Sequence, residues 1–352
     1  MLTGVTAQTL ARFEKLLNIL DMTTKVLVTG CAGLIGSHFT RHLLDKGYEV
    51  SGIDDLSGGY IENIDPRLDF YERNLVDQDA VSNLFRDVRP QYVYHFAAYA
   101  AVGLSPFIRN FNYTNNLLSS VNIINASVNF NVKKFVFASS MDVYGRKTPP
   151  YTEDMALDPE DPYGISKHTV EQDLKSARNF FGLNYSIVRP HNVFGVYQNI
   201  WDKYRNVLGI WIRQTLSGQP ITIYGDGSQI RSFSDVKYYM EPFEKLMRLG
   251  NGEAYNIGAD SSMSILEAAN RFCAVANRLG YQTSIVHLEP RNEVQEAYCD
   301  HSKAKEQLGF RDETNFEDLL EKMFIWAVKQ PSRPVKMMRY EVEKNLYSFW
   351  KK

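Results

Sequence analysis

The chain has 352 residues, of which 44% are hydrophobic and 23% are charged, a composition typical of a globular protein with one large domain or two. The formal net charge of −2 gives no basic field, so we expect neither nucleic acid nor an acidic membrane surface as a partner. The three cysteines fit no disulfide framework or metal site, and there is no membrane-length apolar run or signal-peptide pattern, so we expect a cytoplasmic protein without a bound metal.

Residues 1–24 precede the first predicted strand. Apolar residues recur at helical spacing between Thr9 and Leu20, which predicts an amphipathic helix. Such a helix could dock on the body of the protein or on a partner. Because Met22 stands just before the first strand and would itself make a natural start, we interpret residues 1–24 as a dispensable extension.

A glycine-rich turn lies between the first predicted strand, Lys25–Thr29, and a predicted helix over Ser37–Lys46. Gly30, Gly33 and Gly36 follow at three-residue spacing, a looser form of the dinucleotide fingerprint G-x-G-x-x-G. Such a turn lets the backbone approach a phosphate, which the free N–H groups of the helix N-terminus then face. The pattern predicts a dinucleotide site; a plain turn between two packed elements is the alternative.

A carboxylate after the second strand strengthens this prediction. The predicted strand Glu49–Ile53 is followed by Asp54, which lies 18 residues after Gly36. A carboxylate at this place binds the ribose hydroxyls of the adenosine half and repels a 2′-phosphate. The sequence therefore favours NAD over NADP.

From residue 25 to residue 190 predicted strands alternate with predicted helices, which is typical of an α/β fold with a parallel, doubly wound sheet. Ligands bind at the carboxyl ends of the strands in such sheets. The further strands are Leu68–Glu72, Tyr92–Phe96, Lys134–Ala138 and Tyr185–Arg189, and the further helices are Asp77–Val88, Asn112–Phe130 and Ser166–Phe181.

After residue 190 the pattern changes. The stretch from Pro190 to Asp235 reads as loop-rich, and four helices follow, over Pro242–Leu249, Ser264–Arg278, His301–Leu308 and Asn315–Val328. We interpret residues 191–330 as a smaller second domain across the strand ends, with part of 230–250 returning to the first domain. For residues 331–352 we expect a tail that is partly helical.

Two segments carry side chains suited to acid–base chemistry. Ser140 follows the strand that ends at Ala138, and Tyr163 and Lys167 lie four residues apart just after Pro162. Residues four apart share a helix face, so both can reach one substrate. A nearby ammonium favours the phenolate, and we therefore expect Lys167 to lower the pKa of Tyr163 and make it a general base. The alternative is a solvated Tyr-Lys pair without function; the preceding glycine turn favours catalysis.

Together these motifs make the chain similar to the extended short-chain dehydrogenases/reductases of the NAD-dependent nucleotide-sugar epimerase/dehydratase family, in particular to UDP-glucose 4-epimerases. The resemblance covers Lys25 to Ala327. It implies a Rossmann-type NAD-binding domain over residues 25–190, followed by a mixed α/β domain for a nucleotide-diphospho-sugar. It also implies a homodimer, in which the helices at Asn112–Phe130 and Ser166–Phe181 form a four-helix bundle.

The resemblance assigns roles to individual residues. The glycine turn would hold the pyrophosphate of NAD, and Asn74 would stand beside the adenine in place of the usual aspartate. The implied cofactor-binding residues are Gly30, Gly33, Leu34, Ile35, Gly36, Asp54, Asn74, Leu75, Phe96, Ala97, Ala98, Asn116, Tyr163 and Lys167. The implied catalytic residues are Ser140, Tyr163 and Lys167, and the implied substrate-binding residues are Ser140, Asn192, Asn206, Val207, Arg231, Arg291 and Glu293.

The family mechanism implies reversible oxidation of the sugar at C4, with Tyr163 as the base. Two departures from the family pattern bear on the reaction. Asp235 is displaced from the place of the family acid that opens the next helix. Asp142 stands where 4,6-dehydratases and decarboxylases carry a glutamate base, so a dehydratase or decarboxylase is the first alternative to a 4-epimerase; we expect Asp142 to line the sugar site only. A non-catalytic NAD-binding sensor is a further alternative, against which the intact trio argues.

Overall fold

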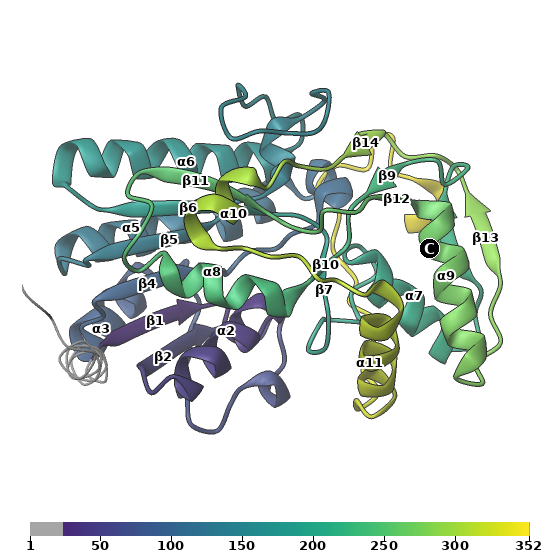
Figure 1. Cartoon of the computed structure of the whole chain (residues 1–352), viewed down its shortest axis with the longest axis horizontal. Helices are drawn as coiled ribbons and strands as arrows, with labels where there is room; N and C mark the ends of the chain where they lie inside the picture. Colours follow the sequence, from purple (N-terminus) through teal and green to yellow (C-terminus); the bar gives the residue numbers. More distant parts are fainter. Residues whose placement is uncertain (1–23, 352) are drawn as a thin grey trace, which may run out of the picture.

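The structure is a computed structural model that describes residues 24–351 (Figure 1). The helix predicted over Thr9–Leu20 lies outside these residues. Seven parallel strands form the central sheet in the order β11-β6-β5-β4-β1-β2-β3. Their bounds are β1 (Lys25–Thr29), β2 (Glu49–Asp54), β3 (Asp69–Glu72), β4 (Tyr92–His95), β5 (Lys134–Ala138), β6 (Tyr185–Pro190) and β11 (Glu253–Ile257).

The predicted α/β fold with a doubly wound sheet is confirmed, and helices cover both faces of the sheet (Figure 1). All five residues of β5 are buried, as a strand covered on both faces requires. One face packs against α2 (Leu34–Asp45), α8 (Met240–Lys245) and α10 (Ser302–Leu308), and the other packs against α3 (Gln78–Val88), α5 (Ser119–Asn129) and α6 (Pro162–Phe181).

Four predicted helices differ from the structure by more than one residue at an end or in continuity. The helix predicted over Pro242–Leu249 is α8, which begins at Met240 and already ends at Lys245. Helix α2 begins three residues earlier than predicted, inside the glycine turn. The helix predicted over Asn112–Phe130 is interrupted: α4 (Arg109–Tyr113) passes into a π-helical turn over Thr114–Leu118 before α5 begins. Helix α6 begins at Pro162 because Asp161 caps it, so Tyr163 lies in its first turn.

The stretch that was predicted to be loop-rich is more regular than expected. It contains α7 (Val207–Leu216), which buries Leu208, Trp211 and Ile212, and the strand β8 (Ile221–Tyr224). Strand β8 pairs with β13 (Ile285–Leu288), and α9 (Ile265–Arg278) and α11 (Phe316–Val328) complete the core of the second domain. Short strands link the two domains: β7 (Val193–Phe194), β9 (Ile230–Arg231), β10 (Ser234–Asp235), β12 (Met263–Ser264) and β14 (Glu296–Ala297).

Parts of the chain after residue 190 return to the first domain. Asp235 caps a 3-10 helix over Val236–Tyr239, which leads into α8, and α8, β11 and α10 all pack on the first sheet. Strand β11 was not predicted. The tail was expected to be partly helical; it is instead an extended segment with one 3-10 turn, Ser348–Trp350. Within residues 24–351 no helix is both long and apolar enough to cross a membrane.

Candidate active site

A cavity of about 970 Å³ lies at the carboxyl ends of the sheet strands, between the two domains. All but one of the residues singled out from the sequence line it, from Gly30 on one side to Glu293 on the other. The exception is Asn116, which is buried behind the wall. Its side chain accepts the N–H of Tyr99 at 2.7 Å and donates to the Tyr99 carbonyl at 3.1 Å, so it fixes the loop after β4 from behind the cavity wall.

The glycine turn has the geometry of a phosphate cradle. Gly30 has a φ of +71°, and a Cβ there would lie 2.7 Å from the Ala97 nitrogen. A Cβ on Gly36 would lie 2.1 Å from the Gly30 carbonyl oxygen. Among residues 24–351 no side chain caps the N-terminus of α2, so its first N–H groups can face an anion. These residues fit the pyrophosphate of a dinucleotide.

Asp54 stands at the next strand end, where the ribose was predicted. Its two carboxylate oxygens accept the N–H groups of Ala32 at 3.0 Å and Leu56 at 2.8 Å. Burial raises the pKa of Asp54, and these two backbone hydrogen bonds oppose that rise. Asn74 lies close by: its amide donates to Asp55, and its side-chain oxygen accepts the Val76 N–H at 2.8 Å.

The three side chains that were predicted to be catalytic, Ser140, Tyr163 and Lys167, meet at the carboxyl end of β5. The Asp161 carboxylate accepts the N–H of Tyr163 at 2.9 Å and so fixes the first turn of α6. Lys167 donates to the Ala138 carbonyl at 2.7 Å, and its ammonium lies 5.8 Å from the centre of the Tyr163 ring. Ser140 hydrogen-bonds the Tyr163 hydroxyl. Burial and helical spacing thus bring the three predicted side chains to one point of the cavity.

The predicted lowering of the Tyr163 pKa is not found in the protein without ligands. Burial, followed by the Asp142 carboxyl, raises the pKa of Tyr163 above its ordinary value, and the hydrogen bond from Ser140 only partly offsets this. Burial also lowers the pKa of Lys167 to about 7. The prediction considered the ammonium alone and neglected the desolvation of both groups.

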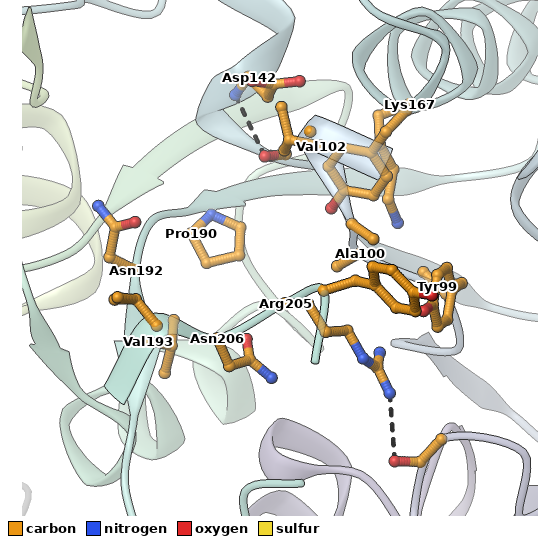
Figure 2. A pocket seen from close by; sticks show the side chains of 18 of the residues that line it. Tyr99, Ala100, Val102, Asp142, Lys167, Pro190, Asn192, Val193, Arg205 and Asn206 are labelled. Atoms are coloured by element: carbon orange, nitrogen blue, oxygen red, sulfur yellow. Dashed lines mark hydrogen bonds between the residues drawn. The ribbon is translucent and has the colours of Figure 1, made fainter. Parts of the chain in front are cut away.

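Asp142 lies at the edge of the cavity against the start of α6. Its N–H donates to the Ser140 hydroxyl at 3.1 Å, drawn as a dashed line in Figure 2. One carboxylate oxygen lies 2.8 Å from where a Cβ would stand on Gly164, so the side chain packs on the first turn of α6. Burial and then the Asp161 carboxylate, to which Asp142 is hydrogen-bonded, raise the pKa of Asp142 well above its ordinary range.

The predicted substrate side chains gather on the second-domain side. Figure 2 shows Asn192, Val193 and Asn206 along one side of the pocket, with Asp142 and Lys167 on another. The amide nitrogen of Asn192 is buried and has no hydrogen-bond partner among residues 24–351. Asn206 precedes α7 in a left-handed conformation, and its side chain leaves the helix N-terminus uncapped. Both features suit an anion or a polar ligand.

Two arginines and one glutamate form the far wall. Arg231 lies 3.2 Å from the Glu293 carboxylate and donates to the Val294 carbonyl at 2.7 Å. The Arg291 guanidinium lies 3.8 Å from the centre of the Tyr224 ring, and its Nε is buried without a partner in the described part of the chain. A fixed pair of guanidinium groups of this kind suits a diphosphate.

The family is decided by comparison with known proteins. The sequence profile of the NAD-dependent epimerase/dehydratase family matches residues 26–258. The chain belongs to this family. Its cofactor is accordingly NAD, as the glycine turn and Asp54 predicted.

Individual relatives of the family agree. A putative UDP-glucose 4-epimerase of Methanocaldococcus jannaschii is 32% identical over 306 residues, which cover 86% of this chain and 97% of the relative. The crystal structure of a UDP-glucose 4-epimerase from Thermotoga maritima with UDP-glucose has a TM-score of 0.82 at 31% identity, covering 87% of this chain and 99% of that one. A dTDP-glucose 4,6-dehydratase from Streptomyces venezuelae with NAD bound has a TM-score of 0.79 at 26% identity, covering 87% and 97%.

Several cavity residues of this family member were missed from the sequence. Arg205 donates to the Gly58 carbonyl at 3.2 Å (Figure 2) and to Asp202 at 3.1 Å; the signal was its place directly before Asn206. Asp161 could have been found as a capping acid before a proline. Asn345 and Tyr347 also line the cavity, although they lie in the tail, where no motif pointed to a site.

Proposed function

We propose that this family member catalyses the reversible C4 epimerisation of a nucleotide-diphospho-sugar of the UDP-glucose/UDP-galactose type. One observation carries the proposal: the Ser140–Tyr163–Lys167 trio opens into the same cavity as the glycine turn and the paired arginines. Bound NAD supplies the hydride acceptor and donor for such a reaction. The residues of this chain bind the sugar nucleotide, orient it and transfer its proton.

Tyr163 is the group that exchanges the proton of the sugar 4-hydroxyl. In its phenolate form Tyr163 accepts the hydroxyl proton as hydride leaves C4, and it returns that proton when hydride is delivered to the other face of the 4-keto sugar. Protonated Lys167, whose ammonium lies 5.8 Å from the centre of the Tyr163 ring, favours the phenolate that this step requires. Ser140 bonds the same oxygen, and Lys167, held by the Ala138 carbonyl, supplies positive charge beside the phenol when protonated. A ligand of this kind would be held at its diphosphate by Arg231, Arg291 and the N-terminus of α7.

A 4,6-dehydratase or decarboxylase remains the first alternative, because Asp142 occupies the position of a C5 base. Three properties argue against that role. Asp142 packs on the first turn of α6, its carboxyl is hydrogen-bonded to Asp161, and burial raises its pKa well above the ordinary range. These contacts hold the carboxyl against α6, and a raised pKa favours the protonated form, which cannot accept the C5 proton. The Asp142–Asp161 pair therefore supports C4 epimerisation over a dehydration or decarboxylation in which Asp142 would be the C5 base.

The proposal is tested by incubating the purified protein with UDP-glucose in deuterated water and examining the recovered sugar by NMR. We expect UDP-galactose with no deuterium at C5, because a 4-epimerase never breaks the C5–H bond. The Asp142→Asn variant should behave in the same way. Deuterium at C5 that disappears in this variant would falsify the epimerase assignment and make Asp142 a base, and NAD binding without turnover of any nucleotide sugar would favour the sensor.

A homodimer is also proposed, formed by the helices around α5 and α6. Large apolar side chains are exposed on this side of the molecule, among them Leu118, Ile165 and Phe180, as an interface would require. Light scattering at micromolar protein should give twice the 40.4 kDa chain mass. Leu118→Glu should lower that mass, whereas Val286→Glu, an equally exposed apolar site on the second domain, should not. A monomeric wild-type protein would contradict the dimer.

A further inference from the structure

The last residues of the chain form a strap that connects the two domains beside the cavity. This C-terminal strap, residues 331–351, is extended and ends at the second domain (Figure 1, yellow). Two of its side chains, Asn345 and Tyr347, line the cavity itself. The mechanism proposed above makes no use of either, and the strap contacts both domains through specific polar and aromatic groups.

The strap is first anchored on the first domain. Arg333 forms an ion pair with Glu62 at 2.5 Å and lies over the Tyr60 ring. Lys336 donates from its ammonium to the Ser57 carbonyl at 2.7 Å, on the loop after β2. Exposed ion pairs contribute little stability by themselves. Together these contacts fix the position of the start of the strap along the surface of the first domain.

The middle of the strap is held more firmly. The Glu341 carboxylate accepts the N–H groups of Asn110 at 2.6 Å and Phe111 at 2.8 Å, which begin α4. The Glu341 N–H in turn donates to the Phe107 carbonyl at 2.8 Å. Near the end of the strap, Trp350 is buried on the same part of the first domain, with its ring 5.8 Å from the Phe107 ring. Burial of a large aromatic side chain is strongly stabilising, so the strap is an integral part of the packed structure.

The end of the strap holds the loop that carries Arg291 and Glu293. The Tyr347 hydroxyl accepts the N–H of Asn292 at 3.1 Å. Asn292 stands between Arg291 and Glu293 in the sequence, so this bond holds the backbone of their loop. The N–H and the hydroxyl of Ser348 both donate to Glu289 at 2.8 Å, just before the loop.

An aromatic contact connects the strap to Tyr224, the ring over which the Arg291 guanidinium lies. The Phe349 ring lies 4.8 Å from the Tyr224 ring, which carries that guanidinium. Trp350 and the Arg291 guanidinium also meet at Gly103, where a Cβ would lie within 4 Å of both. The strap therefore contacts the Tyr224 ring that supports the arginine and the backbone of the Arg291–Glu293 loop, and its Trp350 lies on the same glycine as the guanidinium.

We propose that the strap is a positioning element of the substrate site. It fixes the Arg291–Glu293 loop, and Asn345 and Tyr347 wall the end of the cavity that takes the nucleoside diphosphate. The inference rests on the proposed function for this class of ligand. Because the strap and the nucleoside diphosphate act on the same loop, docking of one stabilises the other, and thermodynamic coupling makes the effect equal in both directions.

The test uses UDP as the probe and the full chain as the protein. Removing the strap would expose the apolar surface under Trp350, so point variants are preferable. Tyr347→Ala should weaken UDP binding in calorimetry about tenfold and raise KM for the nucleotide sugar to the same extent, with kcat and NAD content unchanged. Tyr347→Phe loses only the acceptor for the Asn292 N–H and should show a smaller effect, about threefold. Met337→Ala, at an exposed strap residue away from the cavity, is the matched control and should bind UDP normally.

The reverse direction of the coupling is measured on the wild-type protein. Lys336, Arg339 and Lys344 offer trypsin sites within the strap, and saturating UDP should slow their cleavage, followed by intact mass. Normal UDP affinity in Tyr347→Ala, or strap cleavage that UDP does not change, would overturn the proposal. UDP binding requires no turnover: a protein that binds UDP through the strap yet epimerises nothing would remove the proposed reaction and leave this inference standing.

Discussion

Replacing Tyr163 by phenylalanine should abolish most of the turnover and leave NAD bound. The hydroxyl is the only atom lost, and it is the group placed to exchange the 4-hydroxyl proton beside Ser140. Loss of a general acid–base group lowers rates by about 10²–10⁴-fold. Lys167 keeps its hydrogen bond to the Ala138 carbonyl in this variant, so the cofactor side of the cavity is preserved. Turnover of UDP-glucose and the NAD content of the purified protein are the two measurements.

The matched control is Tyr281→Phe. Tyr281 packs against Phe324 in the second domain and does not line the cavity, so the loss of its hydroxyl should leave activity unchanged. Near-normal activity in Tyr163→Phe would remove this residue from the mechanism. Loss of NAD together with activity would mean instead that Tyr163 acts in cofactor binding.

The first domain could be predicted from the sequence because its signals are local. Each of the six predicted strands is an apolar run bounded by turn residues, and the glycine turn and Asp54 lie at fixed distances along the chain. Strand β11 was missed because Glu253–Ile257 mixes polar and apolar residues, and only the tertiary fold brings it to the edge of the sheet. Helix α7 did carry a signal, the helical spacing of Leu208, Trp211, Ile212 and Thr215.

The sequence could predict which residues line the candidate site, but it could not predict the pKa values of their side chains. Spacing along α6 places Tyr163 and Lys167 together, but the pKa values of both depend on burial, which no spacing reveals. Asn116 was expected to bind the cofactor, whereas the structure shows its side chain behind the cavity wall, bonded to Tyr99, since a motif gives a position and not the direction of a side chain. The contribution of the strap was out of reach for a different reason: its contacts with the cavity bring together residues far apart in the sequence.

The geometry of the glycine turn leads to the second large effect. Gly36→Ala should bind NAD at least roughly tenfold more weakly than the wild type. The new Cβ would lie 2.1 Å from the Gly30 carbonyl oxygen and 2.8 Å from the Cys31 Cα, which are backbone atoms of the turn itself. Backbone atoms cannot rotate away from the new Cβ as a flexible side chain can, so the glycine turn must widen and lose its fit to the pyrophosphate. Overpacking of this kind typically costs about 1–3 kcal/mol, and 1.4 kcal/mol corresponds to a tenfold change in affinity.

Gly47→Ala is the control for Gly36→Ala, because it introduces backbone strain at a glycine without a steric clash in the glycine turn. Gly47 lies just beyond the other end of α2 with a φ of +85°, and a Cβ there would meet nothing within 4 Å. This variant should lose about 1–2 kcal/mol in the free energy of unfolding, because a side chain disfavours the left-handed conformation, and should keep its NAD. NAD content after purification and thermal unfolding of both variants give the comparison. If Gly36→Ala retained NAD as well as Gly47→Ala does, the turn would not be the pyrophosphate cradle, and the site would have to be sought elsewhere along the strand ends.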